Sequence, residues 1–330
     1  MSQPFSIGIN IDGVLDHDGL PALSIDQRFD WIANAKVFDY VEINPGVDED
    51  FMPYIRASER VGVPIKVMGG IFCIGPDVFR GFASVNRQAG ALGCRVFNCQ
   101  VFSRNSAGAD VTLDEMGQFY LEALAIGEKN GCRPSLEVHV DMWAENFARV
   151  SELGEWLAQR GAPLYLTLDH SHLIFKIDNP QQLAKSGLAG ELDLGHALLH
   201  PDSADNFYAQ WLERGWIAHA HTRSVQTNGA PNVLASIQGQ PGRGIQYPFV
   251  QAPEGTYYQA WDESELTTWK RAVEKLLEWK KAHPDTGFNQ ISCEFIPFPD
   301  YGGGARYSIM QQNIACAHWL RQLISEIAQR

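Results

Sequence analysis

The chain has 330 residues, of which 45% are hydrophobic and 20% charged, so it can bury a full-sized core and is too apolar to be a disordered protein. The formal net charge of −13 argues against binding to nucleic acid, which requires a basic surface. There is no run of about 18 apolar residues to span a membrane, and the first residues do not resemble a signal peptide. We therefore expect a cytoplasmic protein.

Eight short β-rich runs recur along the chain. They are Phe5–Ile9, Tyr40–Ile43, Pro64–Met68, Cys94–Cys99, Pro134–His139, Pro163–Leu168, Trp216–Ala220 and Gln290–Phe295. Each is rich in Val, Ile, Leu or aromatic residues, as expected for a strand that is covered on both faces.

Helical periodicity appears between many of these runs. Apolar residues at three- and four-residue spacing predict helices at residues 26–37, 76–92, 113–130, 145–160, 264–283 and 308–329. Thr112 and Ser264 are placed to cap two of them. Repeated strand–helix alternation predicts an α/β fold, a single-domain (β/α)8 TIM barrel over residues 1–330. An open doubly wound sheet is the alternative, but no GxGxxG follows the first strand.

Two glycine-rich segments follow the last two predicted strands. The segment 222–263 after the seventh strand has few helical signals and contains the run GQPGRG. Long loops in compact domains are often lids, so we expect it to cover a substrate, with a surface insertion as the alternative. Residues 301–304, Tyr-Gly-Gly-Gly, follow the eighth strand. We expect a flexible turn there rather than a phosphate-binding loop.

Four consecutive predicted strands end in residues with carboxylate or imidazole side chains. In chain order these are Glu137 and His139, then Asp169, His170 and His172, then His219 and His221, then Glu294. Barrel active sites lie at the C-terminal ends of the strands, where buried carboxylates without partners cost several kcal/mol. A divalent cation would compensate three carboxylates at once. Glu42, Asn98 and Gln100 end other strands and suit either hydroxyl recognition or the anchoring of loops.

The spacing of these residues resembles that of the xylose isomerase-like, or sugar phosphate isomerase/epimerase, superfamily of TIM barrels. The matching order is Glu137, Asp169-x-x-His172, His219-x-His221 and Glu294. Across nearly the whole chain, the resemblance implies that one divalent metal ion is held by Glu137, Asp169, His221 and Glu294. It also implies that His139 and His172 lie beside the substrate.

Two histidine assignments need a choice. The Asp-x-x-His spacing favours His172 over His170. His219 and His221 are two residues apart in a strand and point to the same side, so both are candidates. We choose His221 as the metal ligand because it is nearer the open end of the barrel and matches the superfamily pattern. His219 is then expected to lie below His221, where it would contact the substrate or hydrogen-bond a metal ligand. Arg223 follows, and its planar charged fork suits sugar hydroxyls or a carboxylate, unless it is a surface arginine.

Three carboxylates and one imidazole suit Mn²⁺, Mg²⁺ or Co²⁺ better than a soft-ligand zinc centre, and we expect Mn²⁺, with Zn²⁺ left open. Such an ion would polarise a ketone and stabilise an enediolate. Glu137 and Glu294 stand on opposite sides of the barrel mouth, and the resemblance implies that they act as acid and base. The leading hypothesis is a metal-dependent isomerase or epimerase of a ketose or related keto-polyol.

Two other enzyme classes share the expected site. A lyase or dehydratase of a keto-sugar, keto-inositol or keto-glycoside would use the same proton abstraction and then expel a leaving group. A nuclease similar to the apurinic-site endonucleases would need extra histidines after the third and fourth strands, where the chain has Met68-Gly69 and Asn98-Cys99-Gln100. We therefore expect a small carbohydrate as the partner, and, by analogy with the superfamily, a homo-oligomer.

Overall fold

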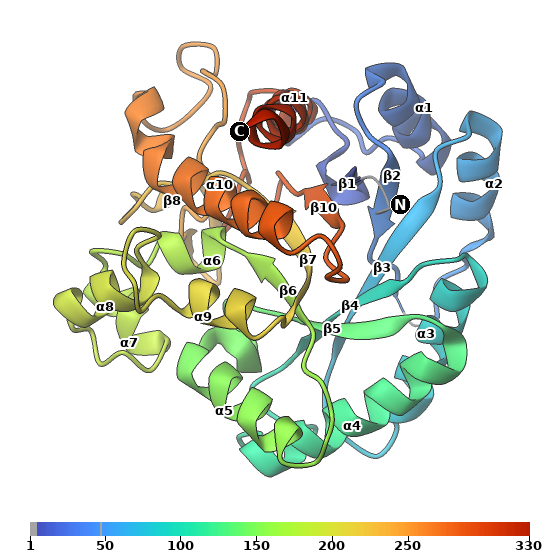
Figure 1. The fold of residues 1–330 in the computed structure, drawn as a ribbon. Helices are drawn as coiled ribbons and strands as arrows, with labels where there is room; N and C mark the ends of the chain where they lie inside the picture. Colours follow the sequence, from blue (N-terminus) through green and yellow to red (C-terminus); the bar gives the residue numbers. More distant parts are fainter. Residues whose placement is uncertain (1–4, 47) are drawn as a thin grey trace.

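The computed structural model describes residues 5–46 and 48–330, which form a closed barrel of parallel strands surrounded by helices (Figure 1). The barrel strands are β1 (Ser6–Asn10), β2 (Tyr40–Ile43), β3 (Ile65–Phe72), β4 (Val96–Val101), β5 (Arg133–Glu137), β6 (Leu166–Asp169), β7 (Ile217–Thr222) and β10 (Gln290–Cys293). Their order around the barrel is β1-β10-β7-β6-β5-β4-β3-β2. The predicted TIM barrel and its eight strands are confirmed.

The helices are α1 (Ile25–Ala35), α2 (Met52–Val61), α3 (Val78–Ala91), α4 (Leu113–Asn130), α5 (Phe147–Ala158), α6 (Ser171–Ile174), α7 (Pro180–Lys185), α8 (Leu192–Leu199), α9 (Phe207–Glu213), α10 (Thr267–Ala282) and α11 (Ile309–Gln329). Short 3-10 helices are η1 (Ile11–Gly13), η2 (Trp143–Glu145) and η3 (Glu263–Leu266). All six predicted helices are present, whereas α2 and α6 to α9 were not predicted.

One of the two predicted helix caps is confirmed. The Thr112 side chain accepts a hydrogen bond from the backbone N–H of Glu115 and forms a capping box at the start of α4. The prediction for Ser264 is wrong, because that residue lies inside η3. Helix α10 continues directly from η3, with Leu266 at its N-cap position and no side-chain cap.

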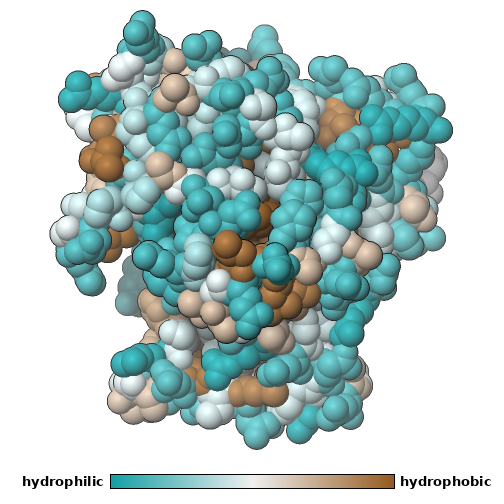
Figure 2. All heavy atoms as spheres, turned by 90° about the vertical axis from the view of Figure 1, so that its left-hand side faces the viewer, coloured by the Kyte–Doolittle hydropathy of each residue, from teal (hydrophilic) through white to brown (hydrophobic). Residues whose placement is uncertain are grey.

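The barrel strands are buried on both faces because helices cover the outside and side chains fill the inside. Every residue of β2, β6, β7 and β10 is buried, which explains why they read as continuous apolar runs. The face carrying α7 and α8 is largely hydrophilic, with apolar side chains in small groups (Figure 2). Within the described part of the chain, no helix is both long and apolar enough to cross a membrane.

The segment after β7 contains a hairpin that the sequence did not predict. Strands β8 (Asn232–Ile237) and β9 (Gln240–Gly242) pair antiparallel. Gln238 and Gly239 turn between them with φ of 52° and 79°, the left-handed conformation that tight two-residue hairpins require.

The hairpin packs on the glycine-rich segment after β10. The Asn232 amide donates hydrogen bonds to the carbonyl oxygens of Pro299 and Gly303, both at 2.9 Å. A Cβ on Gly304, which has φ of 71°, would lie 2.4 Å from the carbonyl oxygen of Leu234 in β8. The glycine-rich segment forms a turn, as expected, and the absence of a side chain on Gly304 allows this turn to pack closely against the hairpin.

Candidate metal centre

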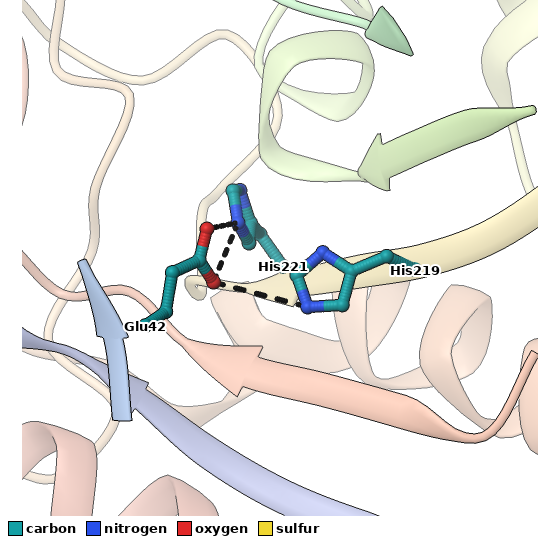
Figure 3. Close-up of side chains that lie close together, drawn as sticks. All are labelled: Glu42, His219 and His221. Atoms are coloured by element: carbon teal, nitrogen blue, oxygen red, sulfur yellow. Dashed lines mark hydrogen bonds and ion pairs between the residues drawn. The ribbon is translucent and has the colours of Figure 1, made fainter. Parts of the chain in front are cut away.

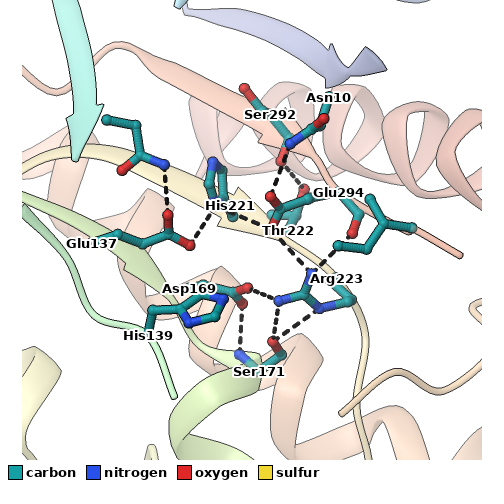
Figure 4. Close-up of polar contacts among 12 residues, drawn as sticks. Asn10, Glu137, His139, Asp169, Ser171, His221, Thr222, Arg223, Ser292 and Glu294 are labelled. Carbon is teal, nitrogen blue, oxygen red and sulfur yellow. Dashed lines mark hydrogen bonds and ion pairs between the residues drawn. The ribbon is translucent and has the colours of Figure 1, made fainter. Parts of the chain in front are cut away.

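Four buried side chains converge at the C-terminal ends of neighbouring strands (Figure 4). Glu137 ends β5, Asp169 ends β6, His221 lies in β7, and Glu294 directly follows β10. One potential ligand atom from each lies within 4.8 Å of the others. His221 is central, because its Nδ1 atom lies 3.3 Å from Glu137 Oε1 and 3.1 Å from Glu294 Oε2. The barrel thus brings together the four residues of the expected metal site.

A fifth buried side chain, Glu42 at the end of β2, fixes the orientation of His221 (Figure 3). Its Oε1 atom lies 3.0 Å from His221 Nε2, so the other ring nitrogen faces the cluster. A carboxylate on the far nitrogen is the usual partner of a metal-binding histidine. The sequence analysis had considered Glu42 only for hydroxyl recognition or loop anchoring.

His219 lies deeper in the barrel than His221. Its Nε2 atom lies 3.1 Å from Ser292 Oγ and 3.4 Å from the Tyr40 hydroxyl, and 3.8 Å from Glu42 Oε2. It is fully buried and is not among the described residues that line the cavity above the cluster. The geometry gives His219 the lower position that was expected, but without a route to a substrate.

Amide side chains hold one oxygen of each glutamate and leave the other toward the cluster. Asn98 Nδ2 and Gln100 Nε2 donate to Glu137 Oε2 at 2.6 and 2.8 Å. Asn10 Nδ2 donates to Glu294 Oε1 at 2.9 Å. Asn98 and Gln100 therefore hold a carboxylate in place, while the part played by Asn10 was not predicted.

Arg223 is buried within the cluster and is not the surface arginine considered as an alternative. Its guanidinium contacts the Asp169 carboxylate, and its Nη1 lies 3.1 Å from Glu294 Oε2. Nη2 lies 3.1 Å from His172 Nε2, and the guanidinium carbon lies 4.1 Å from the ring centroid of Tyr301. Arg223 lines the cavity and also supports two of the four clustered residues.

The two histidines expected beside the substrate lie together. The His139 and His172 ring centroids are 4.2 Å apart, and His139 Nε2 lies 3.1 Å from the Tyr301 hydroxyl. His170 instead packs edge-on against Tyr208 at 5.2 Å. His139 lines the cavity, whereas His172 is fully buried and is not among the described residues that line it. Tyr301 was missed as a site residue because only its glycine-rich context was considered.

The buried charges of the cluster determine one another's protonation. Burial opposes ionisation of Glu137, but the charge on His221 and hydrogen bonding lower its pKa to about 2. Burial likewise opposes a charged imidazole, but Glu294, Glu42 and Glu137 raise the pKa of His221 well above its ordinary value. In the absence of a metal ion, carboxylates therefore surround a charged imidazole.

The residues present fit a divalent cation. Glu137 Oε1 and His221 Nδ1 are buried and make no hydrogen bond within the described part of the chain. Four buried carboxylates, Glu42 included, meet only one permanent cation in the cluster, Arg223. A cation between the open oxygen and nitrogen atoms would satisfy both and balance the charge.

We expect Glu42→Gln to weaken metal binding by about 10- to 100-fold, since an amide supports the His221 ring less strongly than a carboxylate. Isothermal titration with Mn²⁺ measures this. Glu59→Gln, a change at an exposed position of α2, serves as the matched control. Unchanged Mn²⁺ affinity in Glu42→Gln would show that Glu42 does not act through a metal ligand.

Arg243 joins the segment after β7 to two other loops at the mouth. Its Nη2 atom lies 2.5 Å from Asp141 Oδ2 and 2.6 Å from Asp300 Oδ2. The Asp141 N–H donates to Glu145 Oε2 at 2.7 Å, and Glu145 Oε1 lies 2.6 Å from buried Lys176 Nζ. Among the described residues of the segment 222–263, only Arg223 lines the cavity, so most of the segment connects the loops at the mouth rather than covering the cavity.

The buried Lys176, which pairs with Glu145, makes the stability of the folded protein depend on pH. Burial, only partly offset by Glu145, lowers the pKa of Lys176 from 10.5 to about 8. Between these values the unfolded chain holds a proton that the folded protein lacks, so stability rises with pH. Relative to Lys176→Met, we expect the wild type to gain up to roughly 3 kcal/mol in unfolding free energy between pH 8 and 10.5. Urea titrations measure it, with Lys129→Met, a change at an exposed position of α4, as control. If the difference in unfolding free energy between the wild type and Lys176→Met did not change with pH, burial would not lower the pKa of Lys176.

Comparisons with known proteins agree on the fold. No family model matches the chain, and no curated protein shows significant similarity to it. It is similar in structure to a xylose isomerase-like TIM barrel protein from Mycobacterium smegmatis in complex with magnesium (TM-score 0.56, 12% identity, 98% of each chain covered). It is also similar to a 3-keto-D-glucoside 4-epimerase from E. coli (TM-score 0.51, 13% identity, 96% of this chain and 99% of the other). A third match is an AP endonuclease, family 2, from Brucella melitensis (TM-score 0.51, 13% identity, 96% and 98%). The chain has the fold of xylose isomerase-like TIM barrels, as its strand-end residues had suggested.

Proposed function

We propose that this barrel is a divalent-metal-dependent isomerase or epimerase of a ketose or related keto-polyol. The observation that carries the proposal is the buried cluster of Glu137, Asp169, His221 and Glu294, of which Glu294 also lines a cavity at the C-terminal ends of the barrel strands. A divalent cation there would polarise a substrate carbonyl and stabilise the charge that forms when the adjacent carbon loses a proton. The oxygen-rich donor set favours Mn²⁺, with Mg²⁺, Co²⁺ and Zn²⁺ as alternatives.

The two glutamates are the proposed acid and base. Glu294 lines the cavity, whereas Glu137 lies behind it, held by Asn98 and Gln100. We therefore assign removal of the substrate proton to Glu294, which acts as the base. Glu137, on the other side of His221, is the proposed acid. His139 and Arg223 both line the cavity, and each offers an N–H for the oxygens of a sugar.

A lyase is the second candidate, because proton removal next to a ketone also allows a neighbouring oxygen substituent to leave. The observation in its favour is a cavity of about 460 Å³. Pockets for drug-sized ligands have about 300 to 1,000 Å³, so the cavity has room for a substituent that could act as the leaving group. An endonuclease is disfavoured by the charge of −13 and by the absence of histidine from β3 and β4.

Solvent-deuterium exchange tests the proposal and separates its two forms. The Mn²⁺-loaded protein is incubated in D₂O with a panel of ketoses and keto-glycosides, and the products are analysed by mass spectrometry. An isomerase or epimerase adds one mass unit and otherwise conserves mass, whereas a lyase loses water or an alcohol. A protein that binds Mn²⁺ and yet exchanges no carbon-bound proton in any of these sugars would contradict both.

A further inference from the structure

The cavity above the metal cluster has a polar inner half and an apolar outer half. The inner half is lined by Asn10, Asn98, Gln100, His139, Arg223 and Glu294. The outer half is lined by Ile71, Phe72, Met142, Ile296 and Phe298, and Tyr301 lies between the halves, against Arg223 and His139. Asp12 and Asn44 also line the cavity. A free sugar has hydroxyl groups on all sides, which these polar side chains can bind but the apolar ones cannot.

Large apolar side chains of the outer half are exposed to solvent. Ile71, at the end of β3, is 53% exposed, and Phe298, after β10, is 49% exposed. Phe102, after β4, is 43% exposed and lies beside this wall, since its backbone bridges to Met142. Exposed apolar groups from separate loops that meet at one cavity indicate a ligand-binding surface.

We propose that the outer half is a subsite for an aromatic substituent attached to the sugar, so that the substrate is an aryl keto-glycoside rather than a free ketose. This inference rests on the proposed function. The sugar would occupy the inner half, and the aromatic ring would stack on Phe298 and contact Ile71. The cavity of about 460 Å³ lies within the range of about 300 to 1,000 Å³ that pockets for drug-sized ligands have.

The outer half of the cavity includes buried as well as exposed side chains, which favours a small ligand over a protein partner. Phe72 and Ile296 are only 4% and 5% exposed, yet they line the same cavity as Glu294. A second copy of this chain, docking across the mouth, would cover Phe298 and Ile71 but would not reach these deeper side chains. An aromatic group linked to a sugar at the metal cluster would contact both levels.

The test compares phenyl and methyl β-D-3-ketoglucosides as ligands of the Mn²⁺-loaded protein, by calorimetric titration. We expect the phenyl compound to bind at least about tenfold more tightly, because its ring leaves water. Phe298→Ala should weaken phenyl binding and bring the two affinities within about twofold of each other. Leu192→Ala, an exposed apolar residue of α8 that does not line the cavity, is the control and should change neither.

The other outcomes overturn the inference in different ways. Equal binding of both compounds by the wild type removes the aromatic subsite but leaves the sugar site of the proposed function. No binding of either compound removes the sugar site and the subsite together. A wild-type dimer that becomes a monomer in Phe298→Ala, measured by light scattering, would show that the apolar wall is an interface between copies of the chain.

Discussion

Replacing Glu294 with glutamine is expected to lower turnover by about 10³-fold or more, because glutamine cannot accept the substrate proton. The amide oxygen can still accept the hydrogen bond that Asn10 donates to Glu294 Oε1, so the fold around it should persist. The measurement is the rate of solvent-deuterium incorporation into the best substrate at saturating Mn²⁺.

The control for this variant separates loss of the base from loss of the metal. Mn²⁺ content by elemental analysis shows whether Glu294→Gln still holds an ion, since Glu294 is expected to serve as both ligand and base. Glu263→Gln, at an exposed position of η3, should retain full turnover. A Glu294→Gln enzyme that retains its metal and a near-normal rate would end the assignment.

The second large effect concerns His221 and the binding of metal. In the wild type, Mn²⁺ at about 100 times its dissociation constant should stabilise the folded protein by about 2.7 kcal/mol, seen as a higher melting temperature. His221→Ala should lose nearly all of this shift, because the only nitrogen ligand of the expected set is gone. It should also lower the affinity by at least about 100-fold.

His170→Gln is the matched comparison for His221→Ala. His170 is equally buried and adjoins Asp169, but its ring packs against Tyr208 and away from the cluster. This variant is expected to melt at a lower temperature and to keep the full Mn²⁺-induced shift. If the two variants respond to Mn²⁺ alike, the cluster is not the metal site.

The barrel was predictable from sequence because its strands are buried on both faces. Such strands appear as short apolar runs between amphipathic helices, whatever their neighbours are. The clustered residues were found for a related reason, since Glu137, Asp169 and His221 are polar residues at the ends of those runs. Chain order alone places them on adjacent strands, β5, β6 and β7.

Glu42 and Asn10, which hold the clustered residues in place, were harder to predict because they contact residues far away in the sequence. Glu42 lies on β2 and contacts His221 on β7, and these strands are not neighbours. Nothing in the local sequence distinguishes Glu42 from a carboxylate that anchors a loop. The same holds for Asn10, which contacts Glu294 at the other end of the chain.

The helices α6 to α9 and the hairpin of β8 and β9 were not predicted because their sequences lack a regular pattern. Between β6 and β7 the helices α6 to α9 are four to eight residues long, too short for a clear helical period. The hairpin was missed because Pro241 lies in β9, and proline in a run of residues argues against a strand.

The pairing of β1 with β10 determines when the proposed metal site can form. These strands come from opposite ends of the chain, with Ser6 in register with Gln290, and Glu294 follows the last of them. A growing chain on the ribosome cannot assemble the four ligands until this final strand is in place. The complete ligand set of the proposed metal ion therefore forms only with ring closure, and we expect its stabilising effect to appear as slower unfolding rather than faster folding.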